Sequence, residues 1–430
     1  MPSANSLRSQ RRRDVVAWYG YDWANSGYTT LMITVFAVYI QRTVFTTETS
    51  GSTGAVVWAW TVAISMLVGA LLSPIAGALA DARAGKRVGL ALTAFGGSGA
   101  CMAMAIVPPN QAWLVTFFLL VANICLELSL TFYNGFLPEI ANEEEINSVS
   151  SAGMGWGYLG GGIWLALAML LLSFGQSLGL GDGSQLLRIC IFLTGVWWLV
   201  FTIPATVLLR DQKREKSAAT ILQAGHSAFH DVLDTLKQIR VQRTLLLFLI
   251  GFLFFNDGLQ TVISQSSTFA MQELRFTDRE LVGVVLMVQF VAMPGAILTG
   301  WVADKLGRKT TLLLCLGVWI GLLGSAWFIQ SKTAYWLMAS GVAIVLGGTQ
   351  AVSRAIMGVL TPPQQEARYF GFFNLSGKAT SFMGTFVFGL IVALTGSSRL
   401  AIVNLLIFFV IGLGFVWRID LKRGPGKTPS

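Results

Sequence analysis

Long apolar stretches recur along the whole of this 430-residue chain. Each holds about 20 residues, the length that an α-helix needs to cross a hydrocarbon core of roughly 30 Å. Only 12% of the residues are charged, too few to cover a soluble protein of this size. The sequence therefore predicts an all-α polytopic membrane protein. Its twelve expected spans are residues 15–40, 55–80, 87–107, 111–137, 151–174, 187–209, 244–270, 281–303, 310–329, 334–358, 369–394 and 398–417.

Basic residues predict the orientation of the chain. If both termini lie inside, the inner segments carry 22 of the 30 Lys and Arg residues and the outer loops carry six. This bias predicts that both termini are cytoplasmic, and it explains the net charge of +9 without a nucleic-acid partner. The N-terminal segment "MPSANSLRSQRRRDVV" precedes a long, polar-spotted helix without a small-residue cleavage site. We therefore expect a true first span and not a cleaved signal peptide.

A long inner segment, residues 210–243, separates six expected spans from the other six. We expect an N-terminal six-helix bundle over residues 1–209, a cytoplasmic linker over 210–243 and a C-terminal six-helix bundle over 244–430. The second part of the linker predicts an amphipathic helix on the inner membrane surface, because five apolar residues share one helical face. These residues are Phe229, Val232, Leu233, Leu236 and Ile239. His226 and His230 lie four apart in the same segment, but no third ligand accompanies them, so no metal site is predicted.

The first and seventh expected spans repeat one polar pattern. In each, an acid is followed by an amide at +3 and by hydroxyl side chains at +4 and +7, offsets that place all four groups on one face of a helix. Because the two spans hold corresponding positions in the two halves, the pattern predicts a binding or coupling site near the membrane midplane. The residues are Asp22, Asn25, Ser26 and Thr29 in the first span, and Asp257, Gln260, Thr261 and Ser264 in the seventh.

Two short inner turns, "GALADARAGKRVG" and "GWVADKLGRKTT", repeat a second pattern. In both, a glycine precedes an aspartate by four residues, and a glycine and two basic residues follow. Such an aspartate can pair with an arginine and with the positive N-terminal end of a helix, which would clamp neighbouring helices in one conformation and release them in another. We therefore expect a gating role for Asp81, Arg83, Arg87, Asp304 and Arg308.

The repeated turn resembles the signature of the major facilitator superfamily, whose members have twelve spans in two six-helix bundles. The first copy departs from that signature, because Ala82 occupies the usual basic position and Arg83 would have to substitute for it. Further stretches, including "YDWANSGY", "ELSLTFYNGFLPEIA", "GWGYLGG" and "GGTQAVSRAIMG", resemble the vacuole-effluxer-like branch. That branch is named for the autophagy-related vacuolar amino-acid effluxer of fungi and also contains bacterial transporters. The resemblance covers residues 14 to 415 and implies a monomeric secondary transporter, here in a bacterial cytoplasmic membrane.

Five ionisable residues fall inside the expected spans: Asp22, Glu127, Asp257, Arg354 and Lys378. Each would cost a few kcal/mol at the bilayer centre, so each should face a cavity or a partner. In the fold that the resemblance implies, the first, fourth, seventh and tenth helices line the central cavity. An ion pair that merely holds the two bundles together is the alternative for any of the five. The other expected substrate-binding or coupling residues are Asn25, Ser26, Thr131, Asn134, Gln260, Thr261, Gln350 and Asn374.

Three acids and two bases suit a zwitterion or a small polar solute. We expect a secondary active transporter that moves an amino acid, a small peptide or a similar solute by alternating access. Asp22, Glu127 or Asp257 could carry a coupling proton, and Asp22→Asn should abolish proton-driven exchange. A lipid, lysolipid, sugar or drug transporter of the same fold is an alternative, as is a non-transporting receptor or scaffold. No enzyme motif or cofactor is indicated; the expected partners are a small-molecule substrate and membrane lipid.

The fifth expected span, "SAGMGWGYLGGGIW", contains a glycine stripe. Gly153, Gly157 and Gly161 recur at steps of four residues, the small-residue pattern of closely packed helices in lipid. We predict close packing of this helix, with a hinge during transport as the alternative.

Overall fold

The computed structural model describes residues 4–45, 53–83, 85–211, 221–378 and 381–421, and in these residues every regular element is helical. Eleven helical segments among them are long and apolar enough to cross a membrane. A further helical segment at the N-terminus runs through α1 (Ala4–Leu31), η1 (Met32–Phe36), α2 (Ala37–Tyr39) and η2 (Ile40–Val44). With it the chain has the twelve spans that the sequence predicts.

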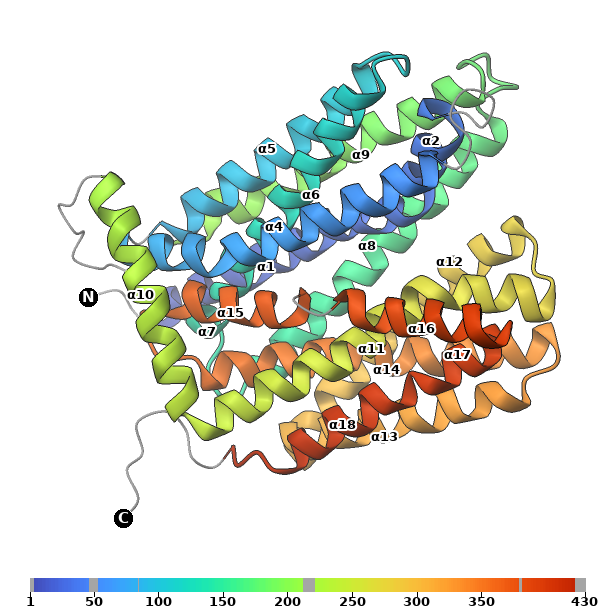
Figure 1. Ribbon diagram of the computed structural model, residues 1–430. Coiled ribbons are helices and arrows are strands. Elements are labelled where there is room, and N and C mark those ends of the chain that lie inside the picture. The colour runs from blue at the N-terminus through green and yellow to red at the C-terminus, as the bar shows by residue number, and fades with distance from the viewer. Residues whose placement is uncertain (1–3, 46–52, 84, 212–220, 379–380, 422–430) are drawn as a thin grey trace.

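The helices form two bundles with α10 (Ile221–Val241) lying across one end (Figure 1). The other helices of the first bundle are α4 (Thr53–Arg83), α5 (Lys86–Ile106), α6 (Ala112–Gly135), α7 (Leu137–Ile140), α8 (Ile146–Phe174) and α9 (Gly183–Leu208). Those of the second are α11 (Arg243–Leu274), α12 (Asp278–Leu306), α13 (Arg308–Ser325), η3 (Ala326–Phe328), α14 (Lys332–Leu360), α15 (Glu366–Lys378), α16 (Ser381–Thr395), α17 (Ser398–Asn404) and α18 (Leu406–Trp417). The twelfth span is thus divided into two helices, α17 and α18.

Local sequence determines where several helices begin. Asp182 and Gln185 form a capping box at the start of α9, and Thr277 and Glu280 form another at the start of α12, so that side chains bind backbone N–H groups that lack intrahelical partners. At the turn between α12 and α13, Gly307 has φ 84°, a conformation that residues with a Cβ rarely adopt. This glycine therefore permits the tight second copy of the repeated turn.

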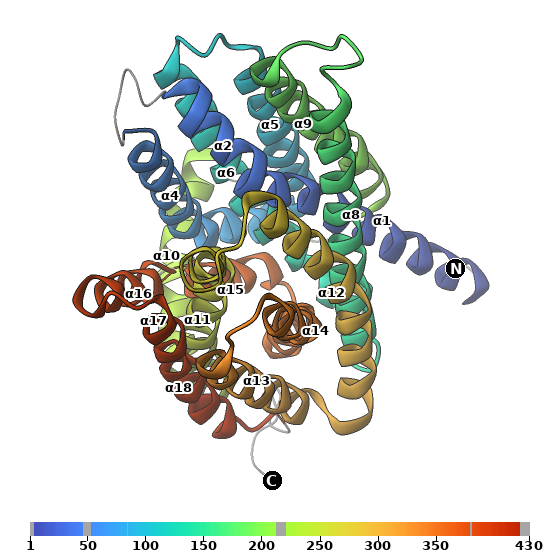
Figure 2. The ribbon, with the colours of Figure 1, turned by 90° about the vertical axis from the view of Figure 1, so that its right-hand side faces the viewer.

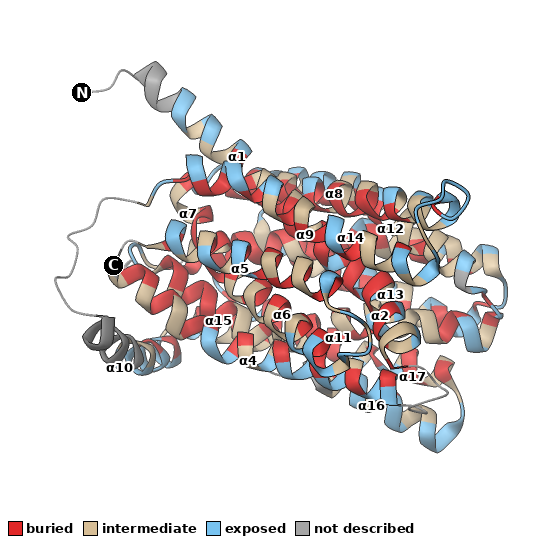
Figure 3. Cartoon of the chain, turned by 90° about the horizontal axis from the view of Figure 1, so that it is seen from above, coloured by how far each residue is buried: buried red, intermediate tan, exposed pale blue. Residues whose placement is uncertain are grey.

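Each bundle has its own buried apolar core; the first comprises residues from Ala17 to Leu209 together with Ala355 and Ala367 of the second bundle, and the second extends from Ile239 to Ile419. Buried residues concentrate where helices face one another, whereas exposed residues lie on the outer faces (Figure 3). Many of the exposed residues are large and apolar, for example Leu92 (70% exposed) and Leu394 (76% exposed). In an integral membrane protein such side chains contact lipid.

Several helix pairs join the bundles, most extensively α8 with α12 and α4 with α15 (Figure 2). Polar contacts accompany both. Gln289 on α12 donates to the Thr30 hydroxyl on α1 at 2.5 Å beside α8, and Asn374 on α15 donates to the Ser73 hydroxyl on α4 at 3.1 Å. A space between the bundles is therefore bounded on both sides by helix contacts.

The glycine stripe of α8 packs against α1. A Cβ at Gly157 would lie 2.8 Å from the Ser26 hydroxyl, and one at Gly161 would lie 2.6 Å from the Thr30 hydroxyl. Because Ser26 and Thr30 are also one helical turn apart, the two stripes meet in register. The close packing predicted from the sequence is confirmed.

Gly157→Leu is expected to lower the stability of the folded protein by about 1–3 kcal/mol, because the added side chain must push α1 away from α8. Thermal unfolding of the purified protein in detergent measures the effect. Gly99→Leu is the matched control, since a Cβ at Gly99 meets no atom within 4 Å. Equal losses in the two variants would show that the α1–α8 contact is not the cause.

The predicted amphipathic helix is present as α10, and part of the apolar face that was expected to lie on the membrane packs on the bundles instead. Thr235 and Ile239 are buried and Val232 is half-buried against the rest of the protein, whereas Leu233 and Leu236 are each 40% exposed. The Phe229 side chain lies outside the described residues. The helix therefore uses one face to dock on the bundles and presents two leucines outward.

Candidate functional site

A cavity of about 470 Å³ lies between the two bundles. Residues of α1, α4, α6 and α8 line one wall, and residues of α11, α12, α14 and α15 line the other. Ten of the thirteen residues predicted for substrate binding or coupling reach it: Asp22, Asn25, Ser26, Glu127, Asn134, Gln260, Gln350, Arg354, Asn374 and Lys378. The polar residues of the expected spans thus converge on one space.

An ion pair between Asp22 and Arg354 connects the two bundles at the cavity. The Arg354 Nη1 atom on α14 donates to Asp22 Oδ2 on α1 at 3.1 Å, and the two side chains are only 5% and 8% exposed. The guanidinium also donates to Ser150 on α8, through Nε to the hydroxyl at 3.0 Å and through Nη2 to the backbone carbonyl at 2.6 Å. Trp18 lies with its ring 4.6 Å from the guanidinium carbon. Arg354 therefore ties two helices of the first bundle to the second.

A second ion pair lies between Glu127 on α6 and Lys378 at the end of α15. The Lys378 Nζ atom is 3.1 Å from Glu127 Oε1, with side-chain exposures of 16% and 4%. Asn374, one turn earlier on α15, donates to the Glu127 backbone carbonyl at 2.9 Å. Lys378 is the more accessible of the two cavity cations.

The two ion pairs have the same polarity. Both acids, Asp22 and Glu127, belong to the first bundle, and both bases, Arg354 and Lys378, belong to the second. The cavity therefore has an anionic wall and a cationic wall that neutralise each other in this conformation. This division depends on tertiary pairing and is not apparent from the sequence of any one span.

Amide and hydroxyl groups fill the rest of the polar lining. Tyr158 on α8 donates to the Gln350 amide oxygen at 2.9 Å, and Gln289 and Asn256 also line the cavity. The sequence prediction did not include these three residues as site residues. Asn256 sits beside Asp257 and Gln289 is a lone polar residue in an apolar span, which are weak signals, and nothing in the sequence marks Tyr158.

Three predicted site residues do not line the cavity. Thr131 and Thr261 are fully buried, and Asp257 is 1% exposed. Thr261 donates to the Asp257 backbone carbonyl at 2.8 Å, and Asp257 Oδ2 accepts the N–H of Gly384 on α16 at 3.0 Å. Asp22 and Asp257 therefore share a sequence pattern, but the groups that contact their carboxylates differ. Asp22 faces the cavity and a cation, whereas Asp257 binds a backbone N–H of α16 in its own bundle.

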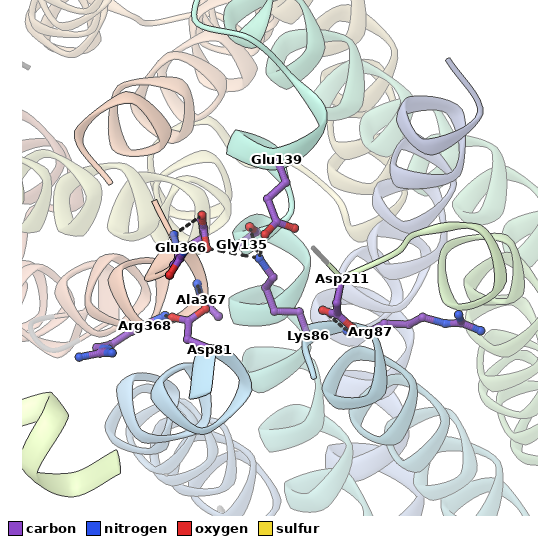
Figure 4. Close-up of polar contacts among 10 residues, drawn as sticks. Asp81, Lys86, Arg87, Gly135, Glu139, Asp211, Glu366, Ala367 and Arg368 are labelled. Atoms are coloured by element: carbon purple, nitrogen blue, oxygen red, sulfur yellow. Dashed lines mark hydrogen bonds and ion pairs between the residues drawn. The ribbon is translucent and has the colours of Figure 1, made fainter. Parts of the chain in front are cut away.

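At the end of the molecule that carries α10, the bundles are joined by a buried charged network, here called the α10-end gate: Asp81, Lys86, Glu139 and Glu366 (Figure 4). The Lys86 Nζ atom lies 2.5 Å from Glu139 Oε1 and 3.5 Å from Glu366 Oε2, and the Lys86 side chain is 1% exposed. Asp81 accepts the backbone N–H groups of Ala367 at 3.2 Å and Arg368 at 2.8 Å. An aspartate of the first bundle thus caps the N-terminus of α15 in the second.

The second copy of the repeated turn also makes contacts between the bundles. Asp304 accepts the Asn147 side-chain N–H at 2.9 Å, and Arg308 Nε donates to the Asn147 side-chain oxygen at 2.7 Å. Arg308 also pairs with Glu143 at 3.6 Å. Each turn therefore binds the start of a helix in the opposite bundle, α15 for Asp81 and α8 for Asp304.

The remaining predicted gating residues behave differently. The Arg87 backbone N–H binds the Asp211 carboxylate at 3.3 Å, and its Nε atom donates to the Thr206 carbonyl. Both partners lie in or after α9, so these contacts of Arg87 stay within its own bundle. The Arg83 side chain lies outside the described residues. Lys86, Glu139 and Glu366, which the sequence analysis did not select, supply the charged contacts.

The linker helix α10 also contacts the start of α15, next to the α10-end gate. Arg368 Nη1 donates to the Asp231 carbonyl at 3.2 Å and to the Thr235 hydroxyl at 3.1 Å, and the Tyr369 hydroxyl donates to Gln238 at 3.2 Å. Because Asp81 binds the Arg368 N–H, α10 and α4 both fix the start of α15.

Arg368→Ala is expected to weaken the docking of α10 by about 1 kcal/mol, because its hydrogen bonds to α10 are lost. Backbone amides of α10 should then exchange with deuterium roughly fivefold faster. Hydrogen exchange followed by mass spectrometry measures this, with Arg240→Ala, an exposed change on α10 itself, as the control. Identical deuterium exchange of α10 in both variants would show that the hydrogen bonds of Arg368 do not hold α10 in place.

The cavity extends away from this closed end. Ser266 on α11, Tyr335 on α14 and Ile402 on α17 line it, and all three lie toward the ends of their helices that are remote from α10. This structure thus has a closed α10 end and a cavity that reaches toward the other end.

No group of three or more His, Cys, Asp or Glu side chains that could hold a metal occurs among the described residues.

The sequence matches the protein family described as "Vacuole effluxer Atg22 like" over residues 43–148 and 143–427. The chain belongs to this family. It is 30% identical over 400 residues to an uncharacterized MFS-type transporter, YxiO, of Bacillus subtilis, and the match covers 92% of both chains. Autophagy-related protein 22 of Kluyveromyces lactis is 27% identical over 331 residues, with 71% of this chain and 65% of that protein covered.

The fold is that of the major facilitator superfamily. The solved structure of the proton:xylose symporter XylE, a member of that superfamily, has a TM-score of 0.73 at 15% identity, with 96% of both chains covered. At this identity the likeness concerns the fold. The predicted fold class and family are confirmed, and both are those of membrane transporters and not of enzymes.

Proposed function

We propose that this family member is a secondary active transporter that moves a small zwitterionic solute, such as an amino acid or small peptide, by alternating access coupled to protons. One observation carries the substrate class: the cavity has acids on one wall and bases on the other. A zwitterion offers the matching charges, with its carboxylate for Arg354 or Lys378 and its ammonium group for Asp22 or Glu127.

Binding of a zwitterion would exchange ion pairs and leave no charge unpaired. A buried pair that loses one partner leaves an uncompensated charge, which is strongly unfavourable. A zwitterion avoids this cost because it supplies both partners at once, whereas an uncharged sugar supplies neither. The cavity volume of about 470 Å³ lies within the usual range of about 300–1,000 Å³ for small-molecule sites.

The two repeated turns supply the change of access. In this conformation Asp81 and Asp304 hold the bundles together at the α10 end, and the cavity extends toward the other end. Release of both contacts and approach of the bundles at the opposite end would expose the solute to the α10 side. The basic-residue bias supports a cytoplasmic location for this end and for both termini, in a bacterial cytoplasmic membrane, with the chain acting as a monomer.

The family description, that of an effluxer, supports export as the direction of transport. Export by exchange with protons uses the proton gradient that a bacterial cytoplasmic membrane maintains. Membrane lipid around the exposed apolar faces would be the only other partner.

The test is transport by the purified protein in liposomes. Radiolabelled L-valine and L-glutamine are the zwitterionic probes, with D-xylose as the uncharged comparator and lysophosphatidylcholine as the lipid comparator. We expect counterflow of one of the amino acids, faster when a pH gradient is imposed, and none of D-xylose. Counterflow of only D-xylose or the lysolipid would contradict the substrate class. No movement of any probe, together with no thermal stabilisation by them, would contradict transport of these solutes and favour a receptor or scaffold.

A further inference from the structure

Asp257 is the one cavity-region acid that lacks a cation. It lies in the middle of α11, is 1% exposed and makes no ion pair with any described residue. Asp22 and Glu127 have Arg354 and Lys378 at 3.1 Å in each case. Of the two Asp257 carboxylate oxygens, Oδ2 accepts one backbone N–H, and Oδ1 has no hydrogen-bond partner among the described residues. Its negative charge is thus the least compensated of the three.

The charged groups on the elements packed against α11 are occupied elsewhere or lie at the ends of the bundle. α16 and α18 contain no ionisable side chain. Arg354 on α14 binds Asp22, and Lys378 on α15 binds Glu127. The charged groups of α10 lie at the gate end with Arg368 of α15.

The other charged groups on these elements form ion pairs: Lys332 with Glu280, Glu366 with Lys86, and Arg399 with Glu273. The tyrosines Tyr335 and Tyr369 donate to Ser266 and Gln238.

Among the described residues, the Asp257 carboxylate has one hydrogen-bond partner, the backbone N–H of Gly384 on α16, at 3.0 Å. A Cβ at residue 384 would lie 3.3 Å from Asp257 Oδ1 and would collide with Thr261, so the glycine allows α16 to approach α11.

We propose that Asp257 binds and releases the proton that is coupled to transport, and that its charge controls the attachment of α16 to α11. Ionised, the carboxylate accepts the Gly384 N–H and holds α16 against α11. With a proton on Oδ1 the charge is gone and the attachment weakens. Asn256 and Gln260, adjacent and three residues on, line the cavity, so a proton has a short route from it to Asp257.

This site can respond to the solute site through the eleventh span. Lys378 on α15 binds Glu127 of the first bundle, and Gly384 on α16 binds Asp257. A solute that displaces Lys378 from Glu127 therefore acts on one half of this span, and the proton acts on the other. The inference rests on the proposed function, because it assigns the residue that would perform its proton coupling.

The decisive variant is Asp257→Asn, which can still accept the Gly384 N–H but cannot ionise. In liposomes, we expect the variant to retain counterflow of the L-valine or L-glutamine probe at equal pH and to lose the acceleration caused by a pH gradient. Asp182→Asn, the same change at an exposed cap of α9, is the matched control and should behave as the unchanged protein. Transport by Asp257→Asn under a pH gradient that equals that of the control would overturn the proposal. The proposal would also be overturned if Asp257→Asn lost transport driven by a sodium gradient and kept transport driven by a pH gradient.

A substrate-free measurement separates this proposal from the proposed function. Infrared difference spectra of the protein in lipid, recorded against pH, report the C=O band of a protonated carboxylic acid. We expect one such band that is present in the Asp182→Asn control and absent in Asp257→Asn. An unchanged set of bands would refute the assignment even if no probe is transported. If Asp257→Asn loses counterflow, Asp257→Glu should restore both counterflow and its pH dependence; restored counterflow without pH dependence would refute the assignment.

Discussion

Arg354→Gln is expected to lower the stability of this conformation by about 3–5 kcal/mol and to abolish transport. The substitution leaves Asp22 as a buried charge without its cation and removes the donors to Ser150. Thermal unfolding in detergent and counterflow in liposomes are the two measurements. Arg279→Gln, at an exposed arginine near the start of α12, is the control and should change neither.

The double variant Asp22→Asn/Arg354→Gln tests the physical cause. It removes both charges, so most of the lost stability should return, whereas transport should not. A double variant as unstable as Arg354→Gln alone would mean that the Ser150 and Trp18 contacts of Arg354, and not the ion pair, hold the bundles together.

Lys86→Met is expected to open the α10-end gate. Without Lys86, the buried carboxylates of Glu139 and Glu366 lose the ammonium group that contacts both of them, at a cost of about 3–5 kcal/mol to the closed conformation. Amides at the start of α15, including those bound by Asp81, should exchange with deuterium about a hundredfold faster, as followed by mass spectrometry.

The control for this variant is Lys237→Met, which removes an exposed lysine paired with Asp234 on the surface of α10. Surface pairs of this kind contribute little, so α15 should exchange as in the unchanged protein. Lys86→Met/Glu366→Gln should restore part of the protection. Unaltered exchange of α15 in Lys86→Met would show that Lys86 is not needed to keep this end closed.

The comparison of Asp22 with Asp257 shows what a repeat in sequence can and cannot establish. The shared spacing of an acid, an amide and two hydroxyl residues correctly indicates two related helices in two related bundles. It cannot indicate the partners, because these come from other helices: Arg354 approaches Asp22 from α14, and Gly384 approaches Asp257 from α16. Equivalent positions in the two bundles therefore acquire different electrostatic surroundings.

The α10-end gate likewise contains residues that the sequence indicates and residues that only the tertiary structure reveals. The repeated turns identify Asp81, Asp304 and Arg308 from sequence, because a tight turn with an acid beside basic residues is a local pattern. Glu366 is distant in sequence from both Lys86 and Glu139, so no local pattern marks this network. Arg87 was selected by spacing alone, and in the structure its contacts lie within its own bundle.

The sequence by itself determined that this chain is an all-helical membrane protein with twelve spans, related halves and a stripe of closely packed glycines. These properties follow from hydrophobic length and residue spacing, which act within one helix. Only the tertiary structure decided that the cavity acids belong to one bundle and its bases to the other, and that Asp257 stands apart from both. Charges inside a membrane are paired through space, and the pairing depends on how helices distant in sequence pack.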